Sequence, residues 1–241
     1  MKKILFVLSL IAVMFIAACS SDSTSSTNND PPGDAMQLPA FETSISPNHT
    51  DFNATSVNAM VNSLGFYFLF VEAYSNIGDL NWDQNGNSWT YSQTSNGLTI
   101  SITITESGDS YIVTIHMKGT IDGETVDADL AKATYKKDGS SGEWHMFAFT
   151  ENPVYEIFGY SWSVASNGTL SATATVYSES SVVELVYQVT LNTDKSGTYT
   201  MKDGDSQLIQ EASWNADGSG SLTIYDSQGG SQTFNWGPNP A

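Results

Sequence analysis

From Trp82 onward, apolar and polar residues alternate along the chain with a period of two. The residues Leu98, Ile100, Ile102 and Ile104 are separated by Thr or Ser, and the same alternation recurs in three further runs. These are 111–117, 170–176 and 183–191. A period of two places alternate side chains on opposite faces of a strand, so the pattern indicates β-strands with one apolar face.

The spacing of these runs predicts an all-β fold of about 10–12 antiparallel strands. Turn residues such as Gly108-Asp109 separate the runs, and no helical periodicity lies between them. Parallel strands would need helical crossovers, so a βαβ fold is excluded. The prediction is an antiparallel meander that forms a barrel, a half-barrel or a sandwich.

One segment before the strands has the periodicity of a helix, at about 56–77. Its apolar residues recur at intervals of three and four, with Asn53 or Thr55 placed to cap it and Gly78-Asp79 placed to end it. Its centre, 64–71, is apolar on every side, as expected of a helix buried against a sheet. A buried strand is the competing interpretation, because Phe, Tyr and Val favour strands. The apolar positions are Val57, Met60, Val61, Leu64, Phe68 and Val71.

Asp, Gly and Ser recur together in several turns, each followed two residues later by a large side chain that is expected to face inward. The turns are 138–142 before Trp144, 194–197 before Tyr199 and 217–220 before Leu222. At a longer spacing, Tyr91 to Asn96-Gly97 parallels Trp162 to Asn167-Gly168. Two related halves of about 70 residues and convergent hairpin chemistry both explain this pattern.

The first nineteen residues have the layout of an export signal. Lys2 and Lys3 form a basic start, an apolar run follows, and the run ends in Ile16, Ala17, Ala18 and Cys19. These residues resemble the lipobox of bacterial lipoproteins. The resemblance implies cleavage before Cys19, a thioether-linked diacylglycerol on that cysteine, and usually a further acyl chain such as palmitate on the new amine. Two or three acyl chains hold a protein stably on a membrane, at about 0.8 kcal/mol per buried methylene.

The expected organisation therefore has three parts. Residues 1–18 are the signal peptide, residues 19–35 are the lipidated terminus with a Ser/Thr/Asn/Asp tether, and residues 36–241 are one β-rich domain. The tether has no residue large enough to pack, and its reach is roughly 20–25 Å. By analogy with enterobacterial lipoproteins, Ser20 after the cysteine favours the outer membrane. Both an orientation toward the periplasm and an orientation toward the medium are compatible with the sequence.

The charge and the cysteine count limit the partners. The net charge is −18, and all eight basic residues are Lys. An acidic chain without Arg repels phosphate backbones and lacks their bidentate ligand, so no nucleic-acid partner is expected. A single cysteine excludes an intrachain disulfide and a zinc site built on several thiolates.

No residue pattern indicates catalysis or a metal site. His49, His116 and His145 are too far apart in sequence to form a local ligand pair, and solvated or core hydrogen-bonded histidines are expected. His145 shares a strand face with Phe147 and Phe149, which would turn it toward a cavity. The acid-rich turns at 83–87, 127–129 and 203–205 lack the spacing of a calcium-binding EF-hand loop.

Strand carboxylates and aromatic residues complete the candidates. There is no G-x-S-x-G motif, and Glu184 and Glu211 lie opposite the apolar residues of their strands, as solvated acids do. Glu143 and Glu156 are the other acids placed in strands. We therefore expect no catalytic residue, no metal and no cofactor. The 6 Trp, 11 Tyr and 11 Phe either fill the core or line a cavity for an apolar or sugar ligand.

These observations leave three hypotheses for function. The first is a non-enzymatic envelope module that binds an apolar small molecule, with the helix against the mouth of a partly closed barrel. The second is a structural or adhesive lipoprotein that contacts other envelope proteins. The third, a carboxylate-dependent hydrolase, has the least support. An apolar cavity above roughly 300 Å³ would favour the first hypothesis.

The lipobox resemblance makes a direct prediction about Cys19. The Cys19→Ser variant should incorporate no labelled fatty acid, because the thiol that carries the diacylglycerol is gone. Metabolic labelling and membrane fractionation measure this, and Ser21→Ala serves as the neighbouring control that retains the label. Membrane partitioning of Cys19→Ser equal to that of the wild type would contradict the assignment.

Overall fold

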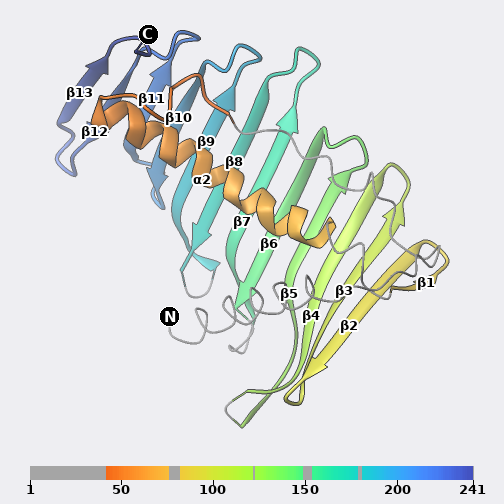
Figure 1. Cartoon of the computed structure of the whole chain (residues 1–241). Helices are drawn as coiled ribbons and strands as arrows, with labels where there is room; N and C mark the ends of the chain where they lie inside the picture. The colour runs from red at the N-terminus through yellow and green to blue at the C-terminus, as the bar shows by residue number, and fades with distance from the viewer. Residues whose placement is uncertain (1–41, 76–81, 122, 149–153, 179–180, 241) are drawn as a thin grey trace.

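The computed structural model describes residues 42–75, 82–121, 123–148, 154–178 and 181–240, with the backbone alone for 65–75. These ranges hold one helix, α2 (Phe52–Ser75), and thirteen strands (Figure 1). The strands are β1 (Asp83–Asn85), β2 (Ser88–Ser95), β3 (Leu98–Ser107), β4 (Ser110–Ile121), β5 (Glu124–Lys136), β6 (Ser141–Ala148), β7 (Tyr155–Val164), β8 (Leu170–Tyr177), β9 (Val183–Leu191), β10 (Gly197–Asp203), β11 (Leu208–Trp214), β12 (Gly220–Tyr225) and β13 (Ser231–Trp236).

The strands form a single antiparallel sheet in which each strand pairs with its neighbours in sequence, from β1 to β13. This confirms the predicted all-β meander with one N-terminal helical segment. The sheet is not closed, because β1 and β13 lie at opposite edges. The described part of the chain has one strand more than the upper predicted number. The three-residue β1 carries no alternation from which it could be predicted.

Strand register collects the apolar side chains on one face, which we call the inner face. One row across it joins Ile104, Val113, Ala133 and Trp144, and all four are buried. The outer face carries Thr, Ser and charged residues, and Thr90 and Thr103 lie opposite each other with their hydroxyl oxygens 3.3 Å apart. The alternation in the sequence therefore corresponds to a sheet with one buried apolar face and one polar outer face.

The helix begins four residues earlier than the predicted position 56, and its cap differs from the prediction. Asp51 is the N-cap, because its Oδ1 accepts hydrogen bonds from the amides of Asn53 (2.8 Å) and Ala54 (3.4 Å). Thr55 lies inside the first turn, where its hydroxyl donates to the Phe52 carbonyl. Both proposed caps, Asn53 and Thr55, are therefore wrong, because Asp51 already accepts hydrogen bonds from the free amides of the first turn. The predicted stop at Gly78-Asp79 lies outside the described residues.

The first half of α2 covers the inner face. Ala54, Val57, Val61 and Leu64 recur every three or four residues and are at most 3% exposed. Contacts to β12 and β13 place the start of the helix at that edge of the sheet, and Figure 1 shows α2 lying over the inner face. The helix therefore shields apolar surface that an open sheet cannot cover by itself.

The segment before α2 is bonded to loops at the C-terminal end of the sheet. The Ser44 amide donates to the Lys195 carbonyl (2.9 Å), and its hydroxyl donates to the Asn215 carbonyl (2.6 Å). Asn239 returns a hydrogen bond from its side-chain amide to the Ser44 carbonyl (2.7 Å). These contacts span more than 150 residues of sequence, so they fix where the helix enters.

Three hairpins repeat one packing device, in which a Trp ring lies over a Gly on the preceding strand. A Cβ added at the Gly would fall within 2.3–2.7 Å of the Trp ring. Each Trp also donates from Nε1 to a carbonyl of an adjacent turn, at 2.7–3.1 Å. The pairs are Gly142 with Trp162, Gly197 with Trp214, and Gly220 with Trp236. The repeated unit of sequence is therefore a hairpin with a Gly that permits close packing.

The longer repeat is weaker in the structure. Asn96 and Gly97 both have positive φ, at 52° and 77°, as in a two-residue hairpin turn. At the corresponding Asn167-Gly168, only the Gly has positive φ, within a wider loop. The two turns differ in geometry, which favours convergent hairpin chemistry over two related halves.

The Gly–Trp packing can be tested at Gly197. In Gly197→Ala, the new Cβ would lie 2.2 Å from the Thr190 carbonyl oxygen and 2.7 Å from the Trp214 ring, so strand or ring must move. We expect the free energy of unfolding to fall by about 1–3 kcal/mol in denaturant titration. The control is Gly237→Ala, where the added Cβ has no atom within 4 Å. Equal stability of the two variants would contradict this role for Gly197.

Candidate ligand pocket

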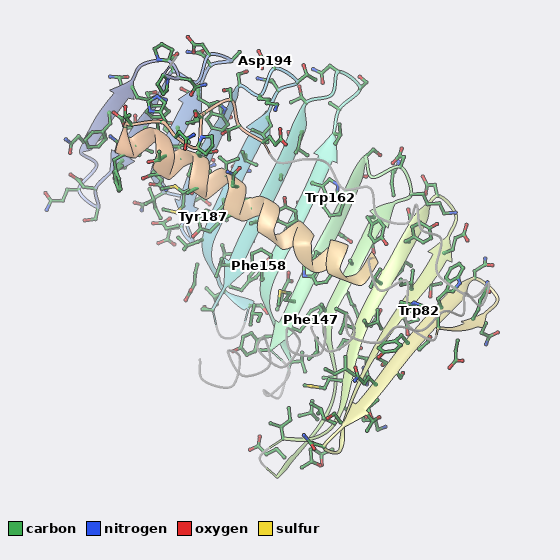
Figure 2. The ribbon with its side chains drawn as sticks, viewed as in Figure 1. Trp82, Phe147, Phe158, Trp162, Tyr187 and Asp194 are labelled. Carbon is green, nitrogen blue, oxygen red and sulfur yellow. The ribbon has the colours of Figure 1, made fainter. Side chains whose placement is uncertain are left out.

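A pocket of about 360 Å³ lies between α2 and the inner face of strands β8 to β11. Met60 and Leu64 line it from the helix, and Val176, Tyr187 and Met201 line it from the sheet. Figure 2 shows Tyr187 beside α2 on the helix-covered face. The volume and the lining meet the condition set for an apolar binding site.

Strand register explains where the pocket forms. Ala174, Tyr187, Met201 and Gln210 lie side by side in one row across β8, β9, β10 and β11. This row crosses the sheet beneath the helix, and Ala174 contributes only a methyl group to the wall. The two methionines of the lining, Met60 and Met201, are flexible and adapt easily to the shape of an occupant.

Gln210 is the polar side chain of this row and is 9% exposed. Its Nε2 donates to the Tyr199 hydroxyl at 3.3 Å and contacts Met60 Sδ at 3.2 Å. Met201 Sδ lies further away, at 4.0 Å. Sequence reasoning did not identify Gln210, although its spacing of two from Ala212 and four from Trp214 places it on the inner face.

Two tyrosines form the aromatic wall. Their ring centroids, in Tyr187 and Tyr199, lie 6.5 Å apart at an interplanar angle of 37°. Burial raises the pKa of Tyr199 to about 12, and burial also raises the pKa of Tyr187. Both phenols therefore stay protonated at neutral pH and can donate hydrogen bonds.

None of the described lining residues is charged. An ionised ligand group would therefore lose its hydration there without gaining a counterion. The pocket consequently favours a neutral occupant, although the chain carries a net charge of −18. The side chain of Phe68, expected on the buried stripe of the helix, lies outside the described residues.

The histidines do not lie in this pocket. His49 is buried and fixed by two hydrogen bonds, from its Nε2 to the Gly237 carbonyl (3.1 Å) and from the Asp51 amide to its Nδ1 (3.1 Å). These two bonds define the neutral tautomer with hydrogen on Nε2. His49 is therefore a hydrogen-bonded structural residue that ties the helix entrance to the end of β13.

The cavity orientation suggested for His145 is wrong. His145 pairs with Lys132 and Gly159 on the outer face, and its Nδ1 lies 2.7 Å from Glu156 Oε1. Trp144 and Ala148 on the same strand are buried in the inner face, so the alternation along β6 turns His145 to the outer face. Phe149 lies outside the described residues.

His116 also lies on the outer face, within a charged group on β4 and β5. Its Nδ1 is 2.8 Å from Asp129 and its Nε2 is 2.9 Å from Asp127. Lys118 and Lys132 pair with the same acids at 2.9 and 2.8 Å. Hydrogen bonding to Lys118 lowers the pKa of Asp127. Partial burial opposes the shift at Asp129, but hydrogen bonds from Lys132 and His116 still lower the pKa of that carboxyl. The negative charges of Asp127 and Asp129 are thus balanced by Lys118 and Lys132.

In the acidic turns, the Asp carboxylate oxygens accept hydrogen bonds from groups of the same turn. Asp203 Oδ1 accepts hydrogen bonds from the amides of Asp205 (3.1 Å) and Gln207 (2.8 Å), and Asp194 Oδ1 accepts from the Ser196 amide and hydroxyl. Such bonds stabilise turns without a metal. Within the described ranges, no group of three or more His, Cys, Asp or Glu residues is arranged to hold a metal ion.

The strand carboxylates do not line the pocket. Glu143 and Glu156 flank His145 on the outer face, at 3.8 and 2.7 Å from its ring nitrogens. Glu211 Oε1 accepts a hydrogen bond from the Tyr225 hydroxyl at 2.5 Å, and Glu184 is exposed. None of these four acids is among the described residues of the pocket wall.

Comparison with known proteins gives no assignment. The sequence matches no family of known proteins, and no curated protein matches it either. In the part of the chain that the structure describes, no helix combines the length and apolar character needed to cross a bilayer.

The turn geometry makes a prediction about metal dependence. Because backbone amides and serine hydroxyls already occupy the Asp194 and Asp203 carboxylates, EDTA should leave the thermal unfolding midpoint unchanged. Differential scanning calorimetry with EDTA, and again with excess Ca²⁺, measures this. A fall of several degrees that Ca²⁺ reverses would contradict it.

Proposed function

We propose that the protein is a non-enzymatic lipoprotein of the cell envelope that binds an apolar small molecule in the pocket beneath α2. Lipid on Cys19 would hold it at a membrane, with the outer membrane as the expected location. Residues 20–35 would act as the tether. The domain would take up its ligand between helix and sheet.

The observation that carries this proposal is the pocket itself. Most of its wall consists of Met, Leu, Val, Ala and Tyr side chains, and its volume of about 360 Å³ lies in the range of small-molecule sites. Aromatic and thioether groups add contact area without fixing one ligand shape. Recognition of a hydrophobic molecule explains why an apolar space remains beside a well-packed core.

The outer face favours a second candidate function, a structural or adhesive role. Rows of hydroxyl side chains cross neighbouring strands there, such as Thr223 with Thr233 at 2.9 Å and Ser88 with Thr105 at 2.8 Å. Such a face offers many hydrogen-bonding groups to an envelope protein. This candidate needs no ligand in the pocket.

A substitution at the rim of the pocket tests the first proposal. Ser63 is exposed on α2 and lines the pocket, so Ser63→Phe should place a ring in the space with little effect on the fold. We expect at least roughly tenfold weaker binding of N-phenyl-1-naphthylamine, equivalent to about 1.4 kcal/mol. Fluorescence titration of the full chain in lipid nanodiscs measures this, with empty nanodiscs as background.

The matched control is Ala59→Phe. Ala59 is exposed on the same helix one turn away and does not line the pocket. This variant should bind the probe like the wild type. Equal losses in the two variants, or no binding above empty nanodiscs, would refute the ligand-binding proposal and leave the structural role.

A further inference from the structure

The polar end of the pocket contains a hydrogen-bond donor with poor partners. Gln210 is nine-tenths buried, and two of the atoms around its Nε2 are the thioether sulfurs of Met60 and Met201, at 3.2 and 4.0 Å. Sulfur of this kind is a weak acceptor. A buried amide that lacks good acceptors is costly, so Gln210 gains from an oxygen acceptor placed in the pocket.

Tyr199 extends this polar end. Its oxygen accepts the hydrogen bond from Gln210 at 3.3 Å, which leaves the phenol hydrogen for another acceptor. Tyr199 is 1% exposed, and the structure shows no acceptor for that hydrogen among the described residues. Gln210 Oε1 likewise has no described partner. The amide and the phenol together can bind one oxygen atom from an occupant.

The charge of the surroundings limits what that oxygen belongs to. No Lys or His is among the described lining residues, so a carboxylate or phosphate would be buried without a counterion. A carbonyl or hydroxyl oxygen needs no counterion. The remaining walls, including Leu64, Val176 and Tyr187, match a hydrocarbon body.

We propose that the pocket selects an uncharged, largely hydrocarbon molecule with one carbonyl or hydroxyl oxygen, which the Gln210 amide and the Tyr199 phenol hydrogen-bond. This inference rests on the proposed ligand-binding function and names its ligand class. Gln210 is then the residue that determines specificity, and the apolar walls supply most of the affinity.

Three naphthalene probes of matched shape test the inference. They share a 6-dimethylamino group and carry at position 2 a propionyl ketone, a propyl chain or a carboxylate. The full chain in lipid nanodiscs should bind the ketone roughly five- to tenfold more tightly than the propyl compound, after correction for partition into empty nanodiscs. The carboxylate should bind at least about tenfold more weakly than the ketone.

Gln210→Leu should remove the preference for the ketone and leave binding of the propyl compound unchanged or slightly stronger. The matched control is Gln188→Leu on β9, an exposed position on the outer face, which should keep the preference. Bound ketone should also emit at shorter wavelength in Gln210→Leu, because its carbonyl loses a hydrogen bond. A purely structural role for Gln210 would change stability without changing this preference or the emission.

The outcomes separate the two proposals. If the wild type binds the propyl compound and the ketone equally, or if it prefers the carboxylate, the ligand class is wrong and the apolar pocket stands. If neither neutral probe binds, both proposals fail. The comparison of the three probes on the wild type decides the question even if Gln210→Leu does not fold.

Discussion

The fold depends on covering one apolar face of an open sheet. Thirteen described strands in sequential order place their apolar residues on the inner face, and the sheet does not close on itself. A closed barrel would bury that face internally, whereas an open sheet needs another layer. The first half of α2 supplies part of that layer through Val57, Val61 and Leu64. The position of the helix is therefore the constraint from which the rest of the structure follows.

Hydrogen bonds at the helix entrance fix that position. Asp51 caps the first turn, His49 bonds to Gly237, and Ser44 bonds to two loops at the C-terminal end of the sheet. Because these partners are far apart in sequence, the helix entrance depends on the loops and strands at the C-terminal end being in place. The helix is held at this end. Further along it, Met60 and Leu64 face Ala174 and Met201 across the pocket.

The surface and the pocket have opposite character. The chain is strongly acidic, and the described contacts of His116 and His145 with acids lie on the outer face, while the described pocket wall is uncharged. A net charge far from zero favours the solubility of a protein surface. A neutral interior suits ligands that would otherwise partition into lipid. This separation is consistent with the proposed role of a tethered module that binds a hydrophobic molecule.

Local pattern was sufficient for most of the strands and for the buried stripe in the first half of the helix. Alternation at Leu98–Ile104 and helical spacing at Val57–Leu64 reflect burial on one side, which each segment encodes by itself. The lipobox resemblance at Cys19 is equally local and stays a prediction. The Asp51 cap was missed because several polar residues precede the helix, and only backbone geometry distinguishes them.

Tertiary structure decided whether the sheet closes, the orientation of His145 and the existence of the pocket. Closure depends on the twist summed over all strands. His145 faces outward because packing buries Trp144 and Ala148, and this decides which face of β6 is the inner one. In the sequence, Gln210 is one of several polar residues in a strand that also contains apolar ones. It becomes a buried donor only when register sets it beside Met201 and α2 brings Met60 over it, because both contacts join segments that no local pattern connects.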